Sequence, residues 1–565
     1  MRMEVYEWAQ NDPRLRVVER KIPQLVLKSL PGVDSLTLID IGVKRFFKVP
    51  KARVVLGEDQ IYAESEEIRR RIARGNSFIR VQFNDGTCRF LQVLRGLCKF
   101  TGNESFDEDV DLEEDKEDEP QDEKKDFRAV WRRFFLDSLS TATCFYRTEK
   151  ANGEAGHLGF VELGKGIHVF VVGSKNCHMI LPSDLDQFEQ SLIAYQDLGE
   201  MHFAEKIARM LLKTVLKDLD SDKLNHLCGL LKKECLTLNF ECMFPDSQHI
   251  VDYKIDESHP GQCKLICFTS WKPENSRFGL CYDFVQGLDL AHSLGIESVS
   301  VLKHDMIDLD ETLFDIRQEK QSEGSVIYFL SESRCIGMWK VKSFWYIFIR
   351  AIREKILRWN VDRIAQRCKE IQSWLKLSDK QVSEWSKQGL LFACYVKQTI
   401  RESKLSFEEL ESNYATCWSR FIASDFSRAD EELLSHKSAC VLGFTFPKSF
   451  PISREEMCHV ADTLDTFIVP HYLKEEKKEL KSKLPRLLKM FQVVMFPWNL
   501  STESERQQLR DVLPRRTRRF KCNLVWISFD SISSDFSPPP NVSDLERVLR
   551  CCSVHEVALA TFLGA

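Results

Sequence analysis

The stretch TATCFYRTEKANGE, residues 141–154, holds the residue on which the interpretation of this chain turns. Its first half is rich in β-forming residues, which predicts a buried strand. Lys150 stands where that strand ends, and Asn152-Gly153 follows as a turn signal. One interpretation is a solvated lysine before an Asn-Gly turn, since K-x-x-G is common by chance. The other is a lysine that meets a ligand held over the end of a sheet.

The composition is that of an ordinary soluble globular protein, with 43% hydrophobic and 29% charged residues among 565. This length predicts two or three domains. No apolar run reaches the ~18–20 residues of a membrane span, and the N-terminus shows no secretory signal. The 19 cysteines form no C-x-x-C pair. We therefore expect reduced thiols, no structural zinc site and a cytoplasmic or nuclear location.

Residues 104–126 form an acidic block of 14 acidic and three basic residues. Like charges at this density repel one another, so we expect a disordered loop. The block contributes −11 to a formal net charge of −5, which leaves +6 for the rest of the chain. A mildly basic folded part permits a polyanionic partner.

The pattern along the chain predicts an α+β protein. Short strand-like runs separated by turn residues fill residues 1–100, which suggests antiparallel pairing. GFVELGKG (159–166) nearly matches a P-loop, but it ends in glycine instead of the metal-binding hydroxyl residue and lies between two strands. We expect a hairpin turn there. Helical spacing covers about residues 185–233, and strand-like runs return afterwards.

We place a domain boundary near residue 360, which gives a first domain of residues 1–360 and a C-terminal domain of residues 361–565. The C-terminal domain is predicted to be mainly helical to about residue 435 and then mixed in strands and helices. Its function as an RNA-binding domain is one interpretation. The basic run 350–367 is an RNA track, an amphipathic packing helix or both, since opposite faces of one helix can serve both roles. PRRTRRFK (514–521) is an RNA-binding patch, a nuclear localisation signal or a solvated link.

Four further stretches place charges in apolar strands. Lys175 lies in GSKN (173–176), Glu241 in LNFECMF (238–244), Glu323 at the start of a strand, and Lys340 and Lys342 two residues apart. Residues two apart on a strand share one face. Each could be an ordinary edge residue. A lone buried charge is costly, however, and these charges would cancel around a phosphate and a divalent metal.

In this order the motifs resemble those of the ATP-dependent RNA ligases of the phage type and the adenylyltransferase domain of fungal tRNA ligase. Two upstream stretches are similar to the family's as well, ARGNSF (73–78) with Arg74 and CKFTGNE (98–104) with Lys99. The resemblance covers roughly residues 50–360. The chain departs from the family pattern by the acidic block and by Thr101-Gly102.

The resemblance implies a covalent nucleotidyltransferase fold of antiparallel sheets with helices, related to ligases and capping enzymes. It also implies a reaction in which Lys150 attacks the α-phosphate of ATP, with Mg²⁺ or Mn²⁺, and forms lysyl-AMP. The AMP passes to a 5′-phosphate on RNA, and a 3′-hydroxyl then displaces it. The implied ATP site comprises Glu149, Lys150, Asn152, Gly153, Arg74, Lys99, Lys175, Phe240, Glu241, Lys340 and Lys342.

The resemblance also implies roles for most of these residues. Lys340 and Lys342 stabilise charge on the transferring phosphate, and Glu323 holds the metal. Glu241 meets the metal or the ribose, and Phe240 stacks on adenine. Glu149 helps to recognise the adenine, while Arg74 and Lys99 hold the pyrophosphate or the RNA 5′-phosphate.

An ammonium ~4 Å from Lys150 would cost about 4 kcal/mol at an effective dielectric of 20. We therefore expect Lys340 or Lys342 to lower the pKa of Lys150 towards neutrality.

The sequence leaves two other classes open. One is a DNA ligase or a capping guanylyltransferase, and the other is a catalytically inactive RNA-binding scaffold. No kinase P-loop and no paired H-x-[ST] motif of an end-healing phosphodiesterase is found. We therefore expect RNA ends that already carry a 5′-phosphate and a 3′-hydroxyl, prepared by separate enzymes.

Overall fold

The computed structural model describes residues 2–424 except 50–53, 103, 105–126, 197–200, 256–258 and 260. Beyond residue 424 it describes residues 438–445, 466–469, 477–491, 493–499, 521–529 and 546–551, with the single residues 426, 507, 509 and 511. Nearly all of the acidic block and residues 514–520 of the C-terminal basic run lie outside this set. No helix in the described part of the chain is both long and apolar enough to cross a membrane.

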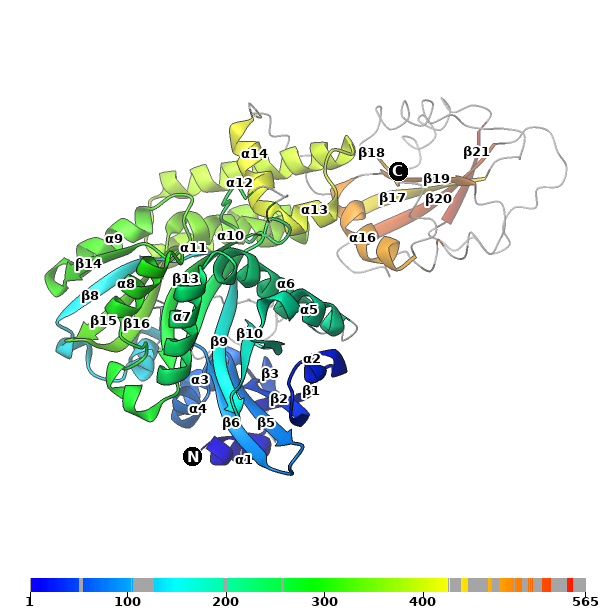
Figure 1. The fold of residues 1–565 in the computed structure, drawn as a ribbon. Helices are drawn as coiled ribbons and strands as arrows, with labels where there is room; N and C mark the ends of the chain where they lie inside the picture. Colours follow the sequence, from blue (N-terminus) through cyan, green and yellow to red (C-terminus); the bar gives the residue numbers. More distant parts are fainter. Residues whose placement is uncertain are drawn as a thin grey trace. The chain divides into compact units, whose positions relative to one another are not determined.

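The chain divides into two compact units, residues 1–347 and 348–565. The first unit begins with a four-stranded antiparallel sheet in the order β1-β2-β5-β6 (Figure 1). In its third strand Ile79, Val81 and Phe83 are buried while Arg80 and Gln82 are exposed, the period of two that a half-buried strand shows. The antiparallel pairing predicted for residues 1–100 is therefore confirmed.

The strands of this sheet are β1 (Leu15–Lys21), β2 (Val33–Val43), β5 (Asn76–Phe83) and β6 (Cys88–Arg95). A small hairpin and four short helices accompany them: β3 (Phe46–Lys48), β4 (Val55–Gly57), α1 (Arg2–Asn11), α2 (Gln24–Lys28), α3 (Glu58–Glu64) and α4 (Glu66–Arg71).

A second antiparallel sheet has the order β11-β10-β9-β12-β13. Its strands are β9 (Glu154–Gly164), β10 (Ile167–Ser174), β11 (His178–Pro182), β12 (Leu236–Met243) and β13 (Gln262–Ser270). The helices that follow β11 are α5 (Phe188–Gln196), α6 (His202–Leu211) and α7 (Ser221–Glu234). Helix α6 packs on β10, and α7 packs on β9 and β12. Strands β9 and β10 form a hairpin across residues 164–166, so the near-match to a P-loop is a turn, as predicted.

The third sheet has the order β14-β8-β15-β16-β7. Its strands are β7 (Thr101–Gly102), β8 (Cys144–Glu149), β14 (Val301–Asp305), β15 (Gly324–Ser331) and β16 (Arg334–Lys342), and all pairs are antiparallel except β7 with β16. Helices α8 (Phe284–Leu294) and α9 (Leu309–Gln318) accompany it. On one face Tyr328 and Met338 share an apolar cluster with Cys267 of β13. This cluster joins the third sheet to the second.

The second unit combines helices with a parallel sheet. Its helices are α11 (Ile364–Leu375), α12 (Asp379–Arg401), α13 (Phe407–Ser412), α14 (Tyr414–Ala423) and α16 (Lys477–Met490), and α10 (Phe344–Leu357) contains the division between the units. Its strands are β17 (Ser438–Thr445), β18 (Thr466–Ile468), β19 (Val493–Asn499), β20 (Lys521–Phe529) and β21 (Glu546–Cys551). They are parallel in the order β18-β19-β17-β20-β21.

The α+β class, with antiparallel sheets and a helical region after them, agrees with the prediction. The parallel pairing of the C-terminal strands was not predicted. Its signal was the run of consecutive apolar residues in Val441-Leu442 and Val493-Val494-Met495-Phe496, which is typical of strands covered on both faces. The division between residues 347 and 348 lies about one helix before the boundary expected near 360.

Candidate active site

Strand pairing in the third sheet brings three predicted charges to one end of it. Strands β15 and β16 pair with Gly324 opposite Lys342. The backbone N–H of Lys150, just beyond the end of β8, donates to the carbonyl of Gly324 at 3.0 Å. Glu323 directly precedes β15. Lys150, Glu323 and Lys342 therefore lie at the same end of three neighbouring strands.

Lys150 and Glu323 form the ion pair at the centre of the site. Lys150 Nζ lies 2.7 Å from Glu323 Oε1, and the two side chains are 21% and 3% exposed. Glu323 Oε2 accepts a hydrogen bond from Asn152 Nδ2 at 2.7 Å. Asn152 Oδ1 in turn accepts from the backbone N–H groups of Ile250 and Val251 at 2.9 and 3.1 Å. Asn152 thus fixes the carboxylate against the lysine.

Two glycines allow the backbone to approach closely here. A Cβ on Gly153 would lie 2.3 Å from the carbonyl oxygen of Cys242. Gly324 has φ +125°, and a Cβ on it would lie 2.0 Å from the carbonyl oxygen of Val341. Any larger residue would push the strands apart, so the glycines after Asn152 and Glu323 are required by packing.

Glu241 reaches the site from β12 of the second sheet. Its Oε1 accepts a hydrogen bond from the backbone N–H of Gly153 at 2.9 Å. Removal from water raises the pKa of the Glu241 carboxyl, and Glu323 raises it further, although Lys150 and Gly153 act in the opposite direction. A carboxyl in this state is stabilised by a proton or by an additional cation.

Lys340 and Lys342 lie on the face of β16 that also carries Met338, while Trp339 and Val341 lie in an apolar cluster on the other face. Their exposed fractions are only 8% and 2%. The Lys342 ammonium lies 5.4 Å from the centre of the Tyr346 ring. Two buried ammonium groups on one face create a positive potential suited to a phosphate.

Three residues near the site were not predicted. Tyr253 accepts a hydrogen bond through its hydroxyl oxygen from the backbone N–H of Asn152 at 2.7 Å. Lys264 Nζ contacts both carboxylate oxygens of Glu149 at 2.9 Å. Arg317 donates to the carbonyl of Lys342 at 2.6 Å.

Of these three, Lys264 had a sequence signal, because it is a lone charge in an apolar strand, CKLICF (263–268). Tyr253 lies outside regular structure and Arg317 near the end of α9, and no motif marks either of them.

The other predicted basic residues lie around helix α3. Lys99 pairs with Asp59 at 2.5 Å and Lys175 with Glu58 at 2.8 Å, and both acids lie in the first turn of that helix. Burial lowers the pKa of Lys175, and the charge of Arg74 lowers it further. These three cations are thus neighbours of a helix N-terminus and of its acids.

Two further expectations meet the structure differently. Phe240 is 1% exposed and belongs to the main apolar core, and neighbouring side chains on a strand point to opposite faces. Phe240 therefore points away from the face of Glu241, and its position does not support stacking on a base.

The run 350–367 begins inside α10, where Ile352 and Ile356 are each 1% exposed. The run continues through a short 3-10 turn into α11. Its apolar side packs, the buried position of Lys355 lowers its pKa to about 8, and the role as an RNA track stays a prediction.

The carboxylates fit a divalent cation that arrives with phosphates. In the described part of the chain, no group of three or more His, Cys, Asp or Glu side chains is arranged to hold a metal ion. Mg²⁺ is commonly held by one or two carboxylates together with the phosphates of a substrate. Glu241 and Glu323, which both lie beside Lys150, provide such a pair.

Comparisons with known proteins give limited similarity. Residues 139–353 match a family described as a domain of unknown function, DUF7920, and no curated protein matches the sequence. Solved structures of an RNA ligase from Naegleria gruberi, variant forms with ATP and manganese, are weakly similar. One has 10% identity and a TM-score of 0.24 over 38% of this chain and 55% of that chain. Another has 9% identity and a TM-score of 0.22 over 60% and 98%.

Proposed function

We propose that the protein is an ATP-dependent RNA ligase that joins 5′-phosphate and 3′-hydroxyl ends through a lysyl-AMP. The observation that carries the proposal is the Lys150–Glu323 ion pair at 2.7 Å, with Glu241 beside it. A buried ion pair contributes little to stability by itself. Its assembly from separate strands supports a role in binding and chemistry.

In the first step Lys150 Nζ attacks the α-phosphorus of ATP. A P–N bond forms, the bond from this phosphorus to the bridging oxygen breaks, and pyrophosphate leaves with the electron pair. The amine must be neutral to attack. If Glu323 held a divalent cation, it would no longer serve as the counter-ion of Lys150, and the Lys150 ammonium beside other cations would lose its proton to solvent more readily.

Lys340 and Lys342 stabilise the negative charge on the transferring phosphate, the largest contribution expected in chemistry of this type. Glu241 and Glu323 would hold the divalent cation, which supplies Lewis-acid stabilisation of phosphate charge when bound. Glu149, fixed by Lys264, would help to recognise the adenine.

Two steps complete the reaction. An oxygen of the RNA 5′-phosphate attacks the phosphorus of lysyl-AMP, the P–N bond breaks, and the Lys150 nitrogen takes up a proton from solvent to leave as the amine while RNA-adenylate forms. The 3′-hydroxyl of a second end then attacks the RNA 5′-phosphorus, loses its proton, and displaces AMP. Both bonds formed are phosphate esters or anhydrides, so no oxidant or reductant is needed.

The test is covalent labelling with ATP that carries the label in its α-phosphate, with magnesium or manganese, followed by a denaturing gel. Lys150→Ala should abolish the label. Lys165→Ala is the matched control, because Lys165 lies on the exposed hairpin and pairs with Asp85. The label should pass to 5′-phosphorylated RNA.

Other outcomes identify the other classes. Label from GTP in place of ATP would indicate capping chemistry, and transfer to 5′-phosphorylated DNA alone would indicate a DNA ligase. No label from either nucleotide, in protein stripped of bound AMP with pyrophosphate, would contradict the proposal and support an inactive scaffold.

A further inference from the structure

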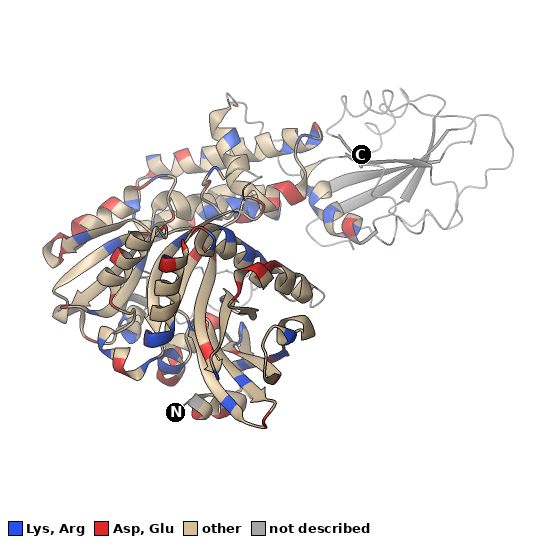
Figure 2. Cartoon of the chain, in the orientation of Figure 1, with Lys and Arg blue, Asp and Glu red and all other residues tan. Residues whose placement is uncertain are grey.

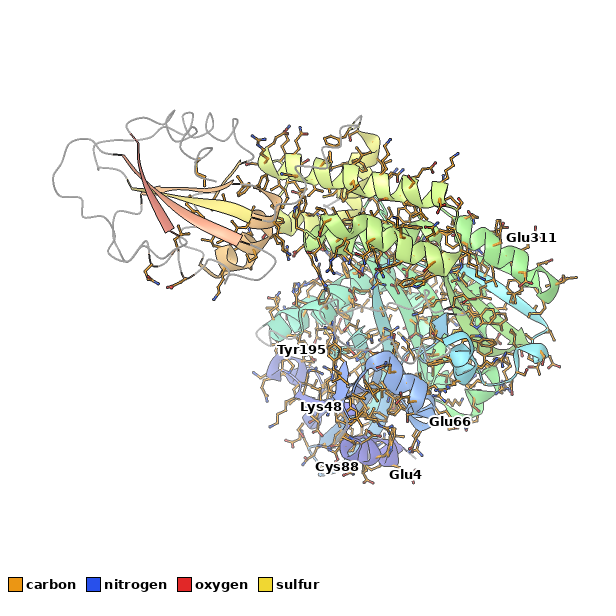
Figure 3. The ribbon with its side chains drawn as sticks, turned by 180° about the vertical axis from the view of Figure 1, so that it is seen from behind. Glu4, Lys48, Glu66, Cys88, Tyr195 and Glu311 are labelled. Atoms are coloured by element: carbon orange, nitrogen blue, oxygen red, sulfur yellow. The ribbon has the colours of Figure 1, made fainter. Side chains whose placement is uncertain are left out.

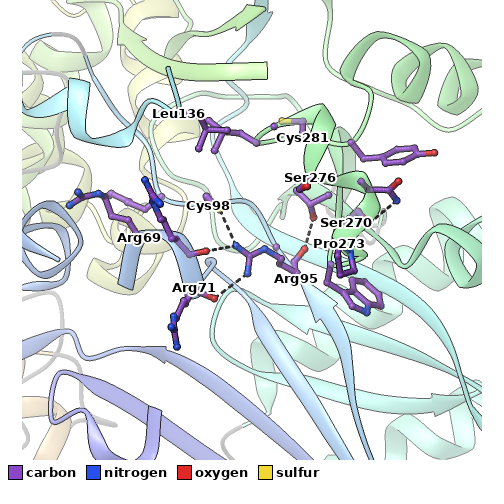
Figure 4. Close-up of a pocket in the computed structure, with 18 of the residues that line it drawn as sticks. Arg69, Arg71, Arg95, Cys98, Leu136, Ser270, Pro273, Ser276 and Cys281 are labelled. Carbon is purple, nitrogen blue, oxygen red and sulfur yellow. Dashed lines mark hydrogen bonds between the residues drawn. The ribbon is translucent and has the colours of Figure 1, made fainter. Parts of the chain in front are cut away.

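A cavity of about 880 Å³ opens between the N-terminal sheet and the segment 269–282 (Figure 4). Neither Lys150 nor Glu323 lines it. Its charged lining is mostly basic, with Arg69, Arg70, Arg71, Arg95, Lys99, Arg133, Lys272 and Arg334. Five of these cations pair with carboxylates: Arg70, Arg71, Lys99, Lys272 and Arg334. Glu4 and Glu66 are its only acidic lining residues among those described, and both lie in the N-terminal part of the chain (Figure 3). Elsewhere on the first unit, basic and acidic residues are interspersed (Figure 2). We call this cavity the basic pocket.

Three guanidinium groups in the basic pocket are held by backbone carbonyls. Arg69 donates to the carbonyls of Tyr62 and Ala63 at 2.8 and 2.7 Å, and Arg133 donates to Ala63 at 3.1 Å. Arg95 donates to two carbonyls at the C-terminal end of α4 at 3.0 and 3.1 Å (Figure 4). Within the described residues, none of the three forms an ion pair with a carboxylate.

Carbonyl oxygens orient these groups but do not cancel their charge. Burial lowers the pKa of Arg69, and the charges of Arg133 and Arg70 lower it further against the opposing effect of Glu66. The arginines therefore repel one another in the absence of a ligand. An anion with several charges would relieve this repulsion.

Aromatic rings accompany the charges. Phe135, Trp271 and Tyr282 also line the basic pocket. Arginine charges interleaved with aromatic side chains are the combination that binds single-stranded nucleic acid, because phosphates contact the cations and bases stack on the rings. The volume lies in the range of roughly 300–1,000 Å³ typical of small-ligand sites, which suits a short single strand and not a duplex.

We infer that the basic pocket binds the phosphates of single-stranded RNA at a distance from the end being joined. The inference rests on the proposed function for the identity of the polyanion. Arg334, in the pocket lining, begins β16, and Lys342 ends it. Eight residue steps at ~3.3 Å separate them by roughly 26 Å. At ~3.4 Å per stacked nucleotide, a strand that reaches both places needs about eight nucleotides.

The test measures RNA binding separately from catalysis. Fluorescence anisotropy would follow a labelled oligouridylate of roughly 20 nucleotides with a 5′-hydroxyl, which cannot accept AMP. Arg133→Ala should weaken binding several-fold and reduce the slope of log K against log salt by about 0.7, the value for one lost single-strand phosphate contact.

Arg132→Ala is the matched control, because Arg132 is the exposed neighbour of Arg133 and does not line the basic pocket. It should leave binding and slope unchanged. The double variant Arg70→Ala with Arg133→Ala should reduce the slope by about 1.4. Both arginines are exposed, so the fold should persist, and thermal unfolding checks this.

The outcomes separate the inference from the proposed function. Wild-type protein that forms no lysyl-AMP, yet binds RNA in an Arg133-dependent way, would contradict only the proposed function. Equal RNA binding by Arg133→Ala and Arg132→Ala would overturn the inference. Displacement of RNA by polyglutamate at equal charge, with the same dependence on Arg133, would overturn it too and assign the basic pocket to an acidic polypeptide.

Discussion

The candidate active site and the basic pocket both gather positive charge, but they balance it differently. At the active site the Lys150 ammonium meets the Glu323 carboxylate at 2.7 Å, with Glu241 close by. In the basic pocket the guanidinium groups of Arg69 and Arg133 are held by carbonyl oxygens and pair with no carboxylate among the described residues. Other cations of the same lining do have carboxylate partners, namely Arg70, Arg71, Lys99, Lys272 and Arg334. A site with its own counter-charges can exchange a small ligand repeatedly without large electrostatic cost. Guanidinium groups that have no carboxylate partner stay attractive to a polyanion, which suits retention of a long substrate.

The largest effect on rate should come from removing the Glu323 carboxylate at the active site. Glu323→Gln removes a carboxylate that would hold the divalent cation, so lysyl-AMP formation should slow by about 10²–10³-fold. Single-turnover labelling with ATP measures the rate. Glu319→Gln is the control, since Glu319 lies nearby in sequence but pairs with Arg147. A labelling rate close to that of the wild type would remove Glu323 from the chemistry.

The second largest contrast between the two regions should be in how strongly their ligand binding depends on salt concentration. Three phosphate contacts in the basic pocket predict that RNA affinity falls roughly 20-fold between 50 and 200 mM salt. The Lys150–Glu323 pair is shielded from solvent, with Glu323 only 3% exposed, so labelling by ATP should change little over the same range. Anisotropy and labelling titrations at matched salt test this contrast. An equally steep salt dependence for both would show that the distinction is wrong.

The pH dependence of stability should show the cost of the charge on Glu241. Because removal from water raises its pKa, the folded protein binds this proton up to a higher pH than the unfolded chain does. Stability therefore falls as pH rises from the unfolded pKa through the folded pKa. Glu241→Gln, which cannot ionise, should raise the Tm by a few degrees near pH 8 and not near pH 4. A lower Tm of the variant near pH 8 would contradict this sign.

The smallest effect should come from the partly buried pair of Lys264 and Glu149 beside the site. Lys264 and Glu149 have side-chain exposures of 16% and 29%, so the pair contributes only about 0.2–1 kcal/mol. Lys264→Ala should raise the KM for ATP a few-fold and leave the maximal labelling rate nearly unchanged. Lys206→Ala, which removes a pair with Asp246, is the control. A large loss of rate would indicate that Lys264 acts directly on the nucleotide.

Local pattern accounts for much of what the sequence predicted. The strand before Lys150, the hairpin at residues 164–166 and the shared face of Lys340 and Lys342 follow from side-chain period and turn chemistry. These features involve residues close in sequence, so composition and spacing suffice. The roles of the site residues stay predictions until the labelling experiments are done.

The sequence by itself determined which segments form strands and which residues carry charge into them. Only the tertiary structure decided which charged groups meet. Asn152 donates to Glu323 across 171 positions of sequence, and Lys99 and Lys175 pair with the acidic residues of α3. The tertiary structure also decided that Phe240 faces the core and that the C-terminal strands are parallel. It brought Arg69, Arg95 and Arg133 to the lining of one cavity. The physical reason is that strand order and sheet packing set these contacts, and both depend on the whole chain burying its apolar surface at once.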